Sequence, residues 1–197
     1  MNMKTLIEKI KILNLFPINT AILCVDCQNS FTLRCSNELP VEETDEVWIK
    51  SINNFLKLAK KEKYKIFASK DDHPKDHISF KEWPMHCVKN TYGNKLFINY
   101  VDYIVKKGSL KETDSYSAFY ENFEDTPNEL DLLLKNNKIK NLIIFGLAGD
   151  ICVLETIKSS IKKGYNTFVI KDFIKSVNKK DIDSILKENK IKTCKSI

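Results

Sequence analysis

The sequence contains no apolar run approaching the roughly 20 residues needed to cross a bilayer, and this absence excludes a transmembrane helix. Residues 1–10 alternate charged and apolar side chains and lack the uninterrupted apolar core of a signal peptide. A basic block interleaved with aromatics is missing too, because the lysines behind the net charge of +6 are mixed with acidic residues throughout. We therefore expect a cytoplasmic protein that binds neither membrane nor nucleic acid.

Repeats, linkers and low-complexity segments are also absent, so residues 1–197 predict one domain, with 1–18 as a helical N-terminal extension. A second Cys-x-x-Cys motif is missing as well. The one such pair, Cys24 and Cys27, falls in an expected strand whose alternation sends the two side chains to opposite faces. We expect all six cysteines to be free thiols, and a redox or metal-binding role for this pair is a weaker alternative.

Expected strands and helices alternate along the chain, which predicts an α/β fold. This order predicts three α/β/α layers, with a mainly parallel central sheet flanked by helices on both faces. Ligands of such folds bind outside the carboxyl ends of the strands. The apolar pattern places strands near 21–25, 64–69, 103–108, 141–146 and 167–170, and helices near 3–13, 43–63, 127–137, from Cys152 onward, and 180–189.

Cys152 follows the strand near 141–146 and a turn of small residues, at the expected start of a helix. The free backbone N–H groups and the helix dipole at such a start favour a thiolate, the form of cysteine that attacks carbon. The same N–H groups can hold a developing oxyanion. A lone cysteine among apolar residues is more often an inert core residue, so this position alone only permits a nucleophile.

All three histidines of the chain lie in one long polar segment after the second strand. Asp71, His73 and His86 offer the ligands of a catalytic metal site with open positions, and a solvated polar loop is the alternative. His77 lies in the same segment. A segment this long inside a compact domain is usually functional.

Asp26 and Lys107 stand at the ends of the first and third strands. A carboxylate there can cap a helix, and a lysine is usually a solvated surface charge. Together with Cys152 they indicate a catalytic group, because a thiol needs a base for its proton and a cation to stabilise the thiolate. All three histidines lie in the polar segment that is expected to bind the metal, which we call the metal segment, so Asp26 is the expected base.

These motifs together resemble the nicotinamidases (pyrazinamidase/nicotinamidase) of the isochorismatase-like cysteine hydrolase superfamily. The resemblance runs in the family's order from about residue 20 to 175. Several separated motifs in register are more specific than any one of them. The matching segments are 25–31 (VDCQNSF), 70–80 (KDDHPKDHISF), 83–88 (WPMHCV), 106–108 (KKG), 114–119 (DSYSAF) and 146–153 (GLAGDICV).

The resemblance implies hydrolysis of nicotinamide to nicotinic acid and ammonia through a cysteine thioester, a reaction of NAD salvage. Asp26 would be the general base, Cys152 the nucleophile and Lys107 the third member of the triad. Backbone N–H groups of Ala148 and Cys152 would form the oxyanion hole, next to a cis peptide between Leu147 and Ala148.

The resemblance also implies one divalent metal ion, zinc in the first place and iron or manganese otherwise, that receives the pyridine nitrogen of the substrate. Asp71, His73 and His86 would bind it, with His77 as a further candidate ligand. Phe31 and Trp83 would sandwich the ring and Tyr116 would line the pocket, although core packing is the commoner fate of aromatic residues. A homo-oligomer is left open.

Three residues depart from the commonest family pattern. Gly149 replaces a usual Thr, Ser30 replaces a frequent Asp, and Asp72 stands where an aromatic is common. Gly149 is expected to loosen the turn before Cys152, and Asp72 adds negative charge near the metal. An amidase of the same superfamily acting on a carbamoyl or maleamate-type amide is the closest alternative, followed by a non-catalytic metal or redox protein.

Overall fold

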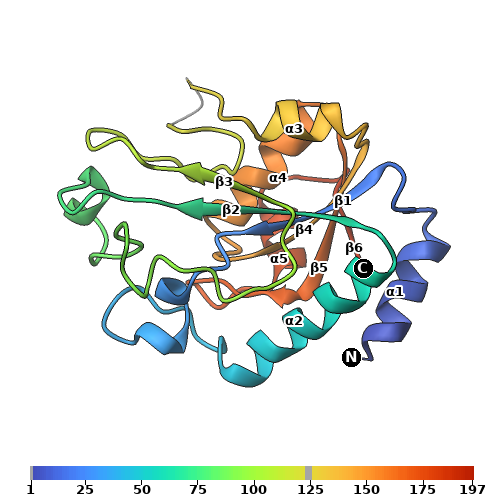
Figure 1. Cartoon of the computed structure of the whole chain (residues 1–197), viewed down its shortest axis with the longest axis horizontal. Helices are drawn as coiled ribbons and strands as arrows, with labels where there is room; N and C mark the ends of the chain where they lie inside the picture. The colour runs from blue at the N-terminus through green and yellow to red at the C-terminus, as the bar shows by residue number, and fades with distance from the viewer. Residues whose placement is uncertain (1, 123–125) are drawn as a thin grey trace.

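The computed structural model describes residues 2–122 and 126–197, which form one sheet covered by helices (Figure 1). The strands of this sheet are β1 (Thr20–Val25), β2 (Lys65–Asp71), β3 (Tyr103–Lys107), β4 (Asn141–Gly146), β5 (Asn166–Ile174) and β6 (Lys195–Ser196). The α-helices are α1 (Met3–Ile12), α2 (Glu46–Lys61), α3 (Leu130–Asn136), α4 (Cys152–Lys162) and α5 (Ile182–Glu188). Short 3-10 helices are η1 (Asn29–Phe31), η2 (Leu33–Cys35) and η3 (Ile78–Lys81).

The strand order is β3-β2-β1-β4-β5-β6, and neighbouring strands are parallel. The first three strands are added from β1 in the middle of the sheet to β3 at one edge. The last three are added from β4, next to β1, to β6 at the other edge. Right-handed crossovers therefore put α2, which joins β1 to β2, and α4, which joins β4 to β5, on opposite faces. This is the three-layer architecture that the sequence predicts, and the point where the order reverses lies between β1 and β4.

Helix α2 shows how the apolar pattern builds a layer. The Asp45 side chain caps its first turn by accepting the N–H of Trp48. Its buried face packs on the sheet through Phe55, whose ring contacts Phe145 of β4 and Phe173 of β5. Val47 belongs to the apolar pattern but is 77% exposed, because it lies on the solvent side of the first turn.

The N-terminal helix α1 extends this layer. Leu6, Ile7 and Ile10 are buried, and α1 lies against α2 in Figure 1. The hydroxyl of Tyr64, at the end of α2, donates to the carbonyl of Leu15 and fixes the segment after α1. The N-terminal extension is thus packed into the same hydrophobic core as the rest of the chain.

Each expected helix and strand is present, with differences at the ends. β5 runs to Ile174, past the apolar run at 167–170, and β6 was not expected because it consists of two polar residues. Among the described residues, no helix has both the length and the apolar character needed to span a membrane.

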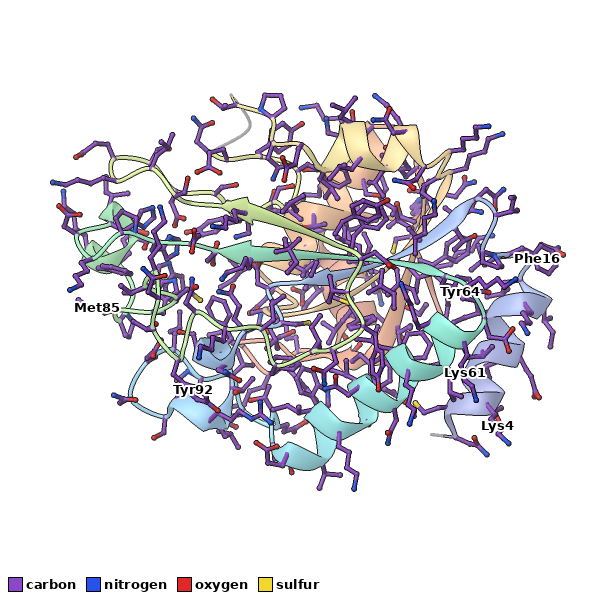
Figure 2. The ribbon with its side chains drawn as sticks, in the orientation of Figure 1. Lys4, Phe16, Lys61, Tyr64, Met85 and Tyr92 are labelled. Carbon is purple, nitrogen blue, oxygen red and sulfur yellow. The ribbon has the colours of Figure 1, made fainter. Side chains whose placement is uncertain are left out.

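The segment between β2 and β3 has η3 as its one helix and covers the carboxyl ends of the strands. Figure 2 shows Met85 and Tyr92 of this segment at the end of the molecule toward which β2 and β3 point. Phe16 lies at the opposite end. Backbone and side-chain hydrogen bonds hold the segment in place, and those near the site are described with it.

Candidate active site

Four residues meet where β1, β2 and β3 end and α4 begins. Asp71 and Lys107 are register partners on β2 and β3, and Asp26 directly follows β1. Cys152 is the first residue of α4. All four side chains are buried, so their charges interact in a medium that screens them weakly.

Lys107 lies at the centre of this group. Its Nζ donates to Asp71 Oδ1 at 2.6 Å and to the Ser115 carbonyl at 2.8 Å, and it lies 3.1 Å from Asp26 Oδ2 and 3.8 Å from Cys152 Sγ. Burial alone would lower the pKa of Lys107, but the two carboxylates raise it well above its usual value. The side chain is therefore an ammonium ion shared by Asp26, Asp71 and Cys152.

Asp26 has a left-handed backbone, with φ of 47°, that turns its side chain into the sheet edge. Its Oδ1 accepts a hydrogen bond of 2.7 Å from Ser69 Oγ, while its own N–H donates back to that oxygen at 3.2 Å. Burial raises the pKa of Asp26 to about 6, against the opposing effect of Lys107. A carboxyl group with this pKa can both accept and return a proton near neutral pH.

The surroundings of the Cys152 thiol favour its protonated form. Burial raises its pKa well above the usual value, which Lys107 offsets only in part, and a hydrogen bond with Asp26 raises it further. Burial thus favours a neutral thiol, which faces the carboxylate of Asp26. The sulfur needs Asp26 to become a nucleophile.

The turn between β4 and α4 brings the backbone close to β1. A Cβ on Gly146, whose φ is 133°, would lie 2.0 Å from the Val25 carbonyl oxygen, so only glycine fits there. The peptide between Leu147 and Ala148 is cis, as the resemblance implied. Within the described residues, the N–H groups of Ala148 and Cys152 have no hydrogen-bond acceptor, so both are free to bind an anion.

Asp71, His73 and His86 form a buried cluster whose ligand atoms all lie within 4.8 Å of one another. The Nδ1 atoms of His73 and His86 each lie 2.7 Å from a backbone carbonyl, of Gly108 and Pro84 respectively. A carbonyl only accepts, so both Nδ1 atoms carry the proton and both Nε2 lone pairs are free. Burial lowers the pKa of His73 to about 3, which keeps it neutral.

This donor set fits a divalent metal ion. One carboxylate and two neutral imidazoles with orienting hydrogen bonds match the ligands that zinc and similar ions take in catalytic sites. Because Lys107 contacts Asp71 through Oδ1, the other oxygen of Asp71 faces His73 Nε2 at 3.8 Å. The metal cluster and the group formed by Asp26, Lys107 and Cys152 therefore share the Asp71 carboxylate.

His77 is placed differently from the three cluster residues. Its ring stacks on that of His73, with centroids 3.9 Å apart. Its Nε2 lies 2.9 Å from the Thr113 carbonyl and must donate to it, while its Nδ1 accepts from Ser79. Both ring nitrogens have hydrogen-bond partners in this arrangement, and the ring supports that of His73. His77 also lies in a second buried group of candidate ligands with His73 and Asp114, so its role as a metal ligand stays a prediction.

Aromatic and apolar side chains line a pocket above Cys152 and the metal cluster. The predicted residues Phe31, Trp83 and Tyr116 all line it, and the Phe31 ring lies 5.5 Å from that of His86. The Trp83 indole donates a hydrogen bond to the Tyr116 hydroxyl. The pocket also contains residues that the sequence did not indicate, because they lie in irregular segments: Leu39, Val41 and Val177. Ile151, in the matching segment 146–153, lines it too.

Polar supports of the site were also missed from sequence. The Gln28 side chain accepts the N–H of Asp71 and donates to its carbonyl, both at 2.8 Å. Asn94 Nδ2 donates to the carbonyls of Asp71 and Cys87, which ties the metal segment together. Gln28 stands two residues after the expected base, and this position at the sheet edge could have indicated its supporting role.

Cys24 and Cys27 correct one expectation. The left-handed φ of Asp26 breaks the alternation after β1, so the two thiols approach closely enough for a hydrogen bond instead of facing opposite sides. Both are fully buried free thiols. Their packing in the core gives them no access to a redox partner or to solvent.

The sequence of this chain was also compared with those of known proteins. A model described as the isochorismatase domain matches residues 20–194. The chain belongs to the isochorismatase family. A nicotinamidase of Escherichia coli (strain K12) is 32% identical over 187 residues, which cover 83% of this chain and 86% of that protein.

Solved structures of the isochorismatase family agree with this fold. The pyrazinamidase of Pyrococcus horikoshii in complex with zinc superimposes with a TM-score of 0.80 at 30% identity, covering 91% of this chain and 98% of that one. The yeast nicotinamidase bound to the inhibitor nicotinaldehyde has a TM-score of 0.77 at 25% identity, covering 90% and 99%.

Two departures from the isochorismatase-family pattern are compensated locally. The Asp72 carboxylate pairs with Lys106 at 2.9 Å and accepts a hydrogen bond from Asn94 at 3.2 Å. Despite burial, these partners hold the pKa of Asp72 below the usual value.

At Gly149 a Cβ would lie 2.4 Å from Ser176 Oγ and 2.7 Å from Ile174 Cγ2. Neighbouring side chains thus fill the space that a larger residue would need, and the turn is packed rather than loose.

This packing predicts that Gly149→Ala destabilises the fold by roughly 1–3 kcal/mol, the usual cost of overpacking. The Ser176 hydroxyl has no hydrogen-bond partner among the described residues, so Ser176→Ala removes the nearer obstacle at little cost. Thermal unfolding should show a smaller loss for Gly149→Ala in the Ser176→Ala background than in the wild type. Equal losses in both backgrounds would contradict this account of Gly149.

Proposed function

We propose that this protein is an amidohydrolase that converts nicotinamide to nicotinic acid and ammonia, with Cys152 as nucleophile and Asp26 as base. The observation that carries this proposal is the Lys107 ammonium, which contacts Asp26, Asp71 and Cys152 and so joins a cysteine–carboxylate pair to a metal cluster. Nicotinamidases recur among the relatives of the chain. In a cell this reaction returns nicotinamide to NAD synthesis.

The reaction begins when Asp26 takes the thiol proton and Cys152 Sγ attacks the carboxamide carbon. The N–H groups of Ala148 and Cys152 donate hydrogen bonds to the oxyanion of the tetrahedral intermediate. Asp26 then gives its proton to the amide nitrogen, the C–N bond breaks, and ammonia leaves a thioester. A water molecule attacks the thioester as Asp26 accepts its proton, and nicotinic acid leaves when that proton returns to sulfur.

Lys107 serves each of these steps without exchanging a proton. Its pKa lies well above the usual value, so it remains a cation throughout. The cation stabilises negative charge on the sulfur at 3.8 Å, and its contact with Asp26 fixes the carboxylate that faces the thiol.

Asp71, His73 and His86 would hold a divalent metal ion, which we propose is zinc, in keeping with the zinc-bound relative. When bound, this ion supplies a Lewis-acidic centre for the pyridine nitrogen and so orients the ring. Phe31, Trp83 and Tyr116 form the walls that hold the ring and exclude water. A ring fixed at both ends presents its amide carbon to Cys152.

Purified protein is expected to release ammonia from nicotinamide, and pre-treatment with a chelator should lower this rate at least tenfold until zinc is restored. Parallel assays with maleamate and with a carbamoyl amide test the nearest alternative, since faster turnover of either would replace nicotinamide as the substrate. No ammonia release from any amide would refute the proposal.

A further inference from the structure

The metal segment is held from one side by a residue that departs from the family pattern. Ser30 is fully buried, and its Oγ accepts the N–H of Cys87 at 2.8 Å. Cys87 directly follows His86 and has a left-handed φ of 49°. Its carbonyl accepts from Asn94 Nδ2 at 2.9 Å and from the His73 N–H at 3.2 Å. Both backbone polar groups of Cys87, the residue after His86, are therefore fixed.

A second residue completes this contact. The Ser30 hydroxyl donates to Glu38 Oε2, so the carboxylate polarises the oxygen that accepts from Cys87. Among the described residues, Glu38 forms no ion pair with a lysine or arginine within 4 Å. Glu38 also fills the space beside Gly93, where a Cβ would lie 2.3 Å from both carboxylate oxygens. The position of the carboxylate is thus defined from two sides.

We propose that Ser30 and Glu38 act together as positioning residues for the metal ligand His86, a role that rests on the function proposed above. The Glu38 carboxylate acts on the Cys87 N–H through the Ser30 hydroxyl, which accepts from Cys87 and donates to Glu38. The same two segments also position the wall of the pocket. Leu39, next to Glu38, lines the substrate pocket and donates its N–H to the Ser30 carbonyl at 3.2 Å. Metal affinity and ring binding therefore depend on one pair of side chains.

The direct test is the zinc affinity of the purified protein, measured by competition with a chromophoric chelator. Glu38→Ala should weaken zinc binding about tenfold or more, the range found when groups that orient metal ligands are removed. Glu38→Gln retains an acceptor oxygen for the Ser30 hydroxyl, so its affinity should stay within about threefold of wild type. Zinc affinity is read without turnover, so this result is independent of whether nicotinamide proves to be the substrate.

A pair of substitutions separates positioning from general loosening of the structure. Ser30→Asp alone places a second buried carboxylate against Glu38 and should weaken zinc binding, because like charges repel there. In the Glu38→Ala background the same substitution restores one carboxylate beside the Cys87 N–H and should recover most of the lost affinity. The sign of the Ser30→Asp effect is therefore expected to reverse between the two backgrounds.

Glu46→Ala is the matched control, since it removes an exposed carboxylate that pairs with Arg34 of the same irregular segment and leaves Ser30 untouched. Its zinc affinity should equal that of wild type. Equal affinities for wild type and Glu38→Ala, or a Ser30→Asp effect of the same sign in both backgrounds, would overturn the proposal. The KM for nicotinamide should rise in Glu38→Ala as zinc affinity falls. Purely structural damage would lower the unfolding temperature, but the Ser30→Asp effect on zinc affinity would then keep the same sign in both backgrounds.

Discussion

Cys152→Ala is expected to abolish ammonia release from nicotinamide, by about 10⁴-fold or more, while the protein keeps its fold and metal content. The substitution removes the atom that bonds to the substrate carbon, and no other thiol can take its place. Among the described residues, Cys152 is the cysteine that lines the substrate pocket. Effects of this size are usual when the nucleophile of an acyl-transfer enzyme is removed.

The measurement is the rate of ammonia release, together with bound zinc and the thermal unfolding midpoint of the same preparation. Cys194→Ala is the matched control, because it removes another buried thiol, near the C-terminal strand β6. That variant should retain wild-type turnover to within a few fold. Persisting amidase activity in Cys152→Ala would show that the nucleophile lies elsewhere.

Asp26→Asn is expected to lower kcat/KM by about 10³-fold, within the range that general bases contribute. The amide has the shape of the carboxylate and can still accept from Ser69, but it cannot take the thiol proton. Lys107 keeps Asp71 as its counter-ion in this variant. Removing the lysine would be a poorer test, because taking away one partner of a buried ion pair can cost roughly 3–5 kcal/mol of stability.

The pH dependence follows from the pKa of Asp26, which burial raises to about 6. Below that pH the carboxyl group is protonated in the folded protein and cannot accept a proton, so kcat/KM of the wild type should fall tenfold per pH unit on the acid side. In Asp26→Asn this dependence on an acid group near pH 6 should disappear. Asp131→Asn, on the distant helix α3, should keep the wild-type profile, and an unchanged profile in Asp26→Asn would refute the assignment of the base.

The sequence predicted those parts of the molecule that local patterns determine. Apolar runs such as Ile143 to Phe145 define the buried strands of a parallel sheet, and strand order then brings Asp26, Lys107 and Cys152 to one edge. The clustering of His73 and His86 in one segment indicated the metal site in the same way. These features depend on short stretches of chain, so they can be recognised without coordinates.

Features that depend on distant contacts were not predictable. Glu38 reaches Ser30 from an irregular segment that has no periodicity, and Ser176 fills the space at Gly149 from 27 residues away. The neutral Cys152 thiol follows from burial, which the position at a helix start could not reveal. The approach of Cys24 and Cys27 depends on one left-handed residue between them.

The single ammonium of Lys107 has a consequence for protein engineering. Because its two carboxylates belong to different centres, Asp71 cannot be exchanged to alter metal preference without also changing the charge balance that the base experiences. In the part of the chain that the structure describes, His86 forms no hydrogen bond or ion pair with Lys107, so it is a position at which metal selectivity can be redesigned with less effect on the base. Transplanting the cysteine and its base onto another scaffold would likewise require carrying over the metal carboxylate.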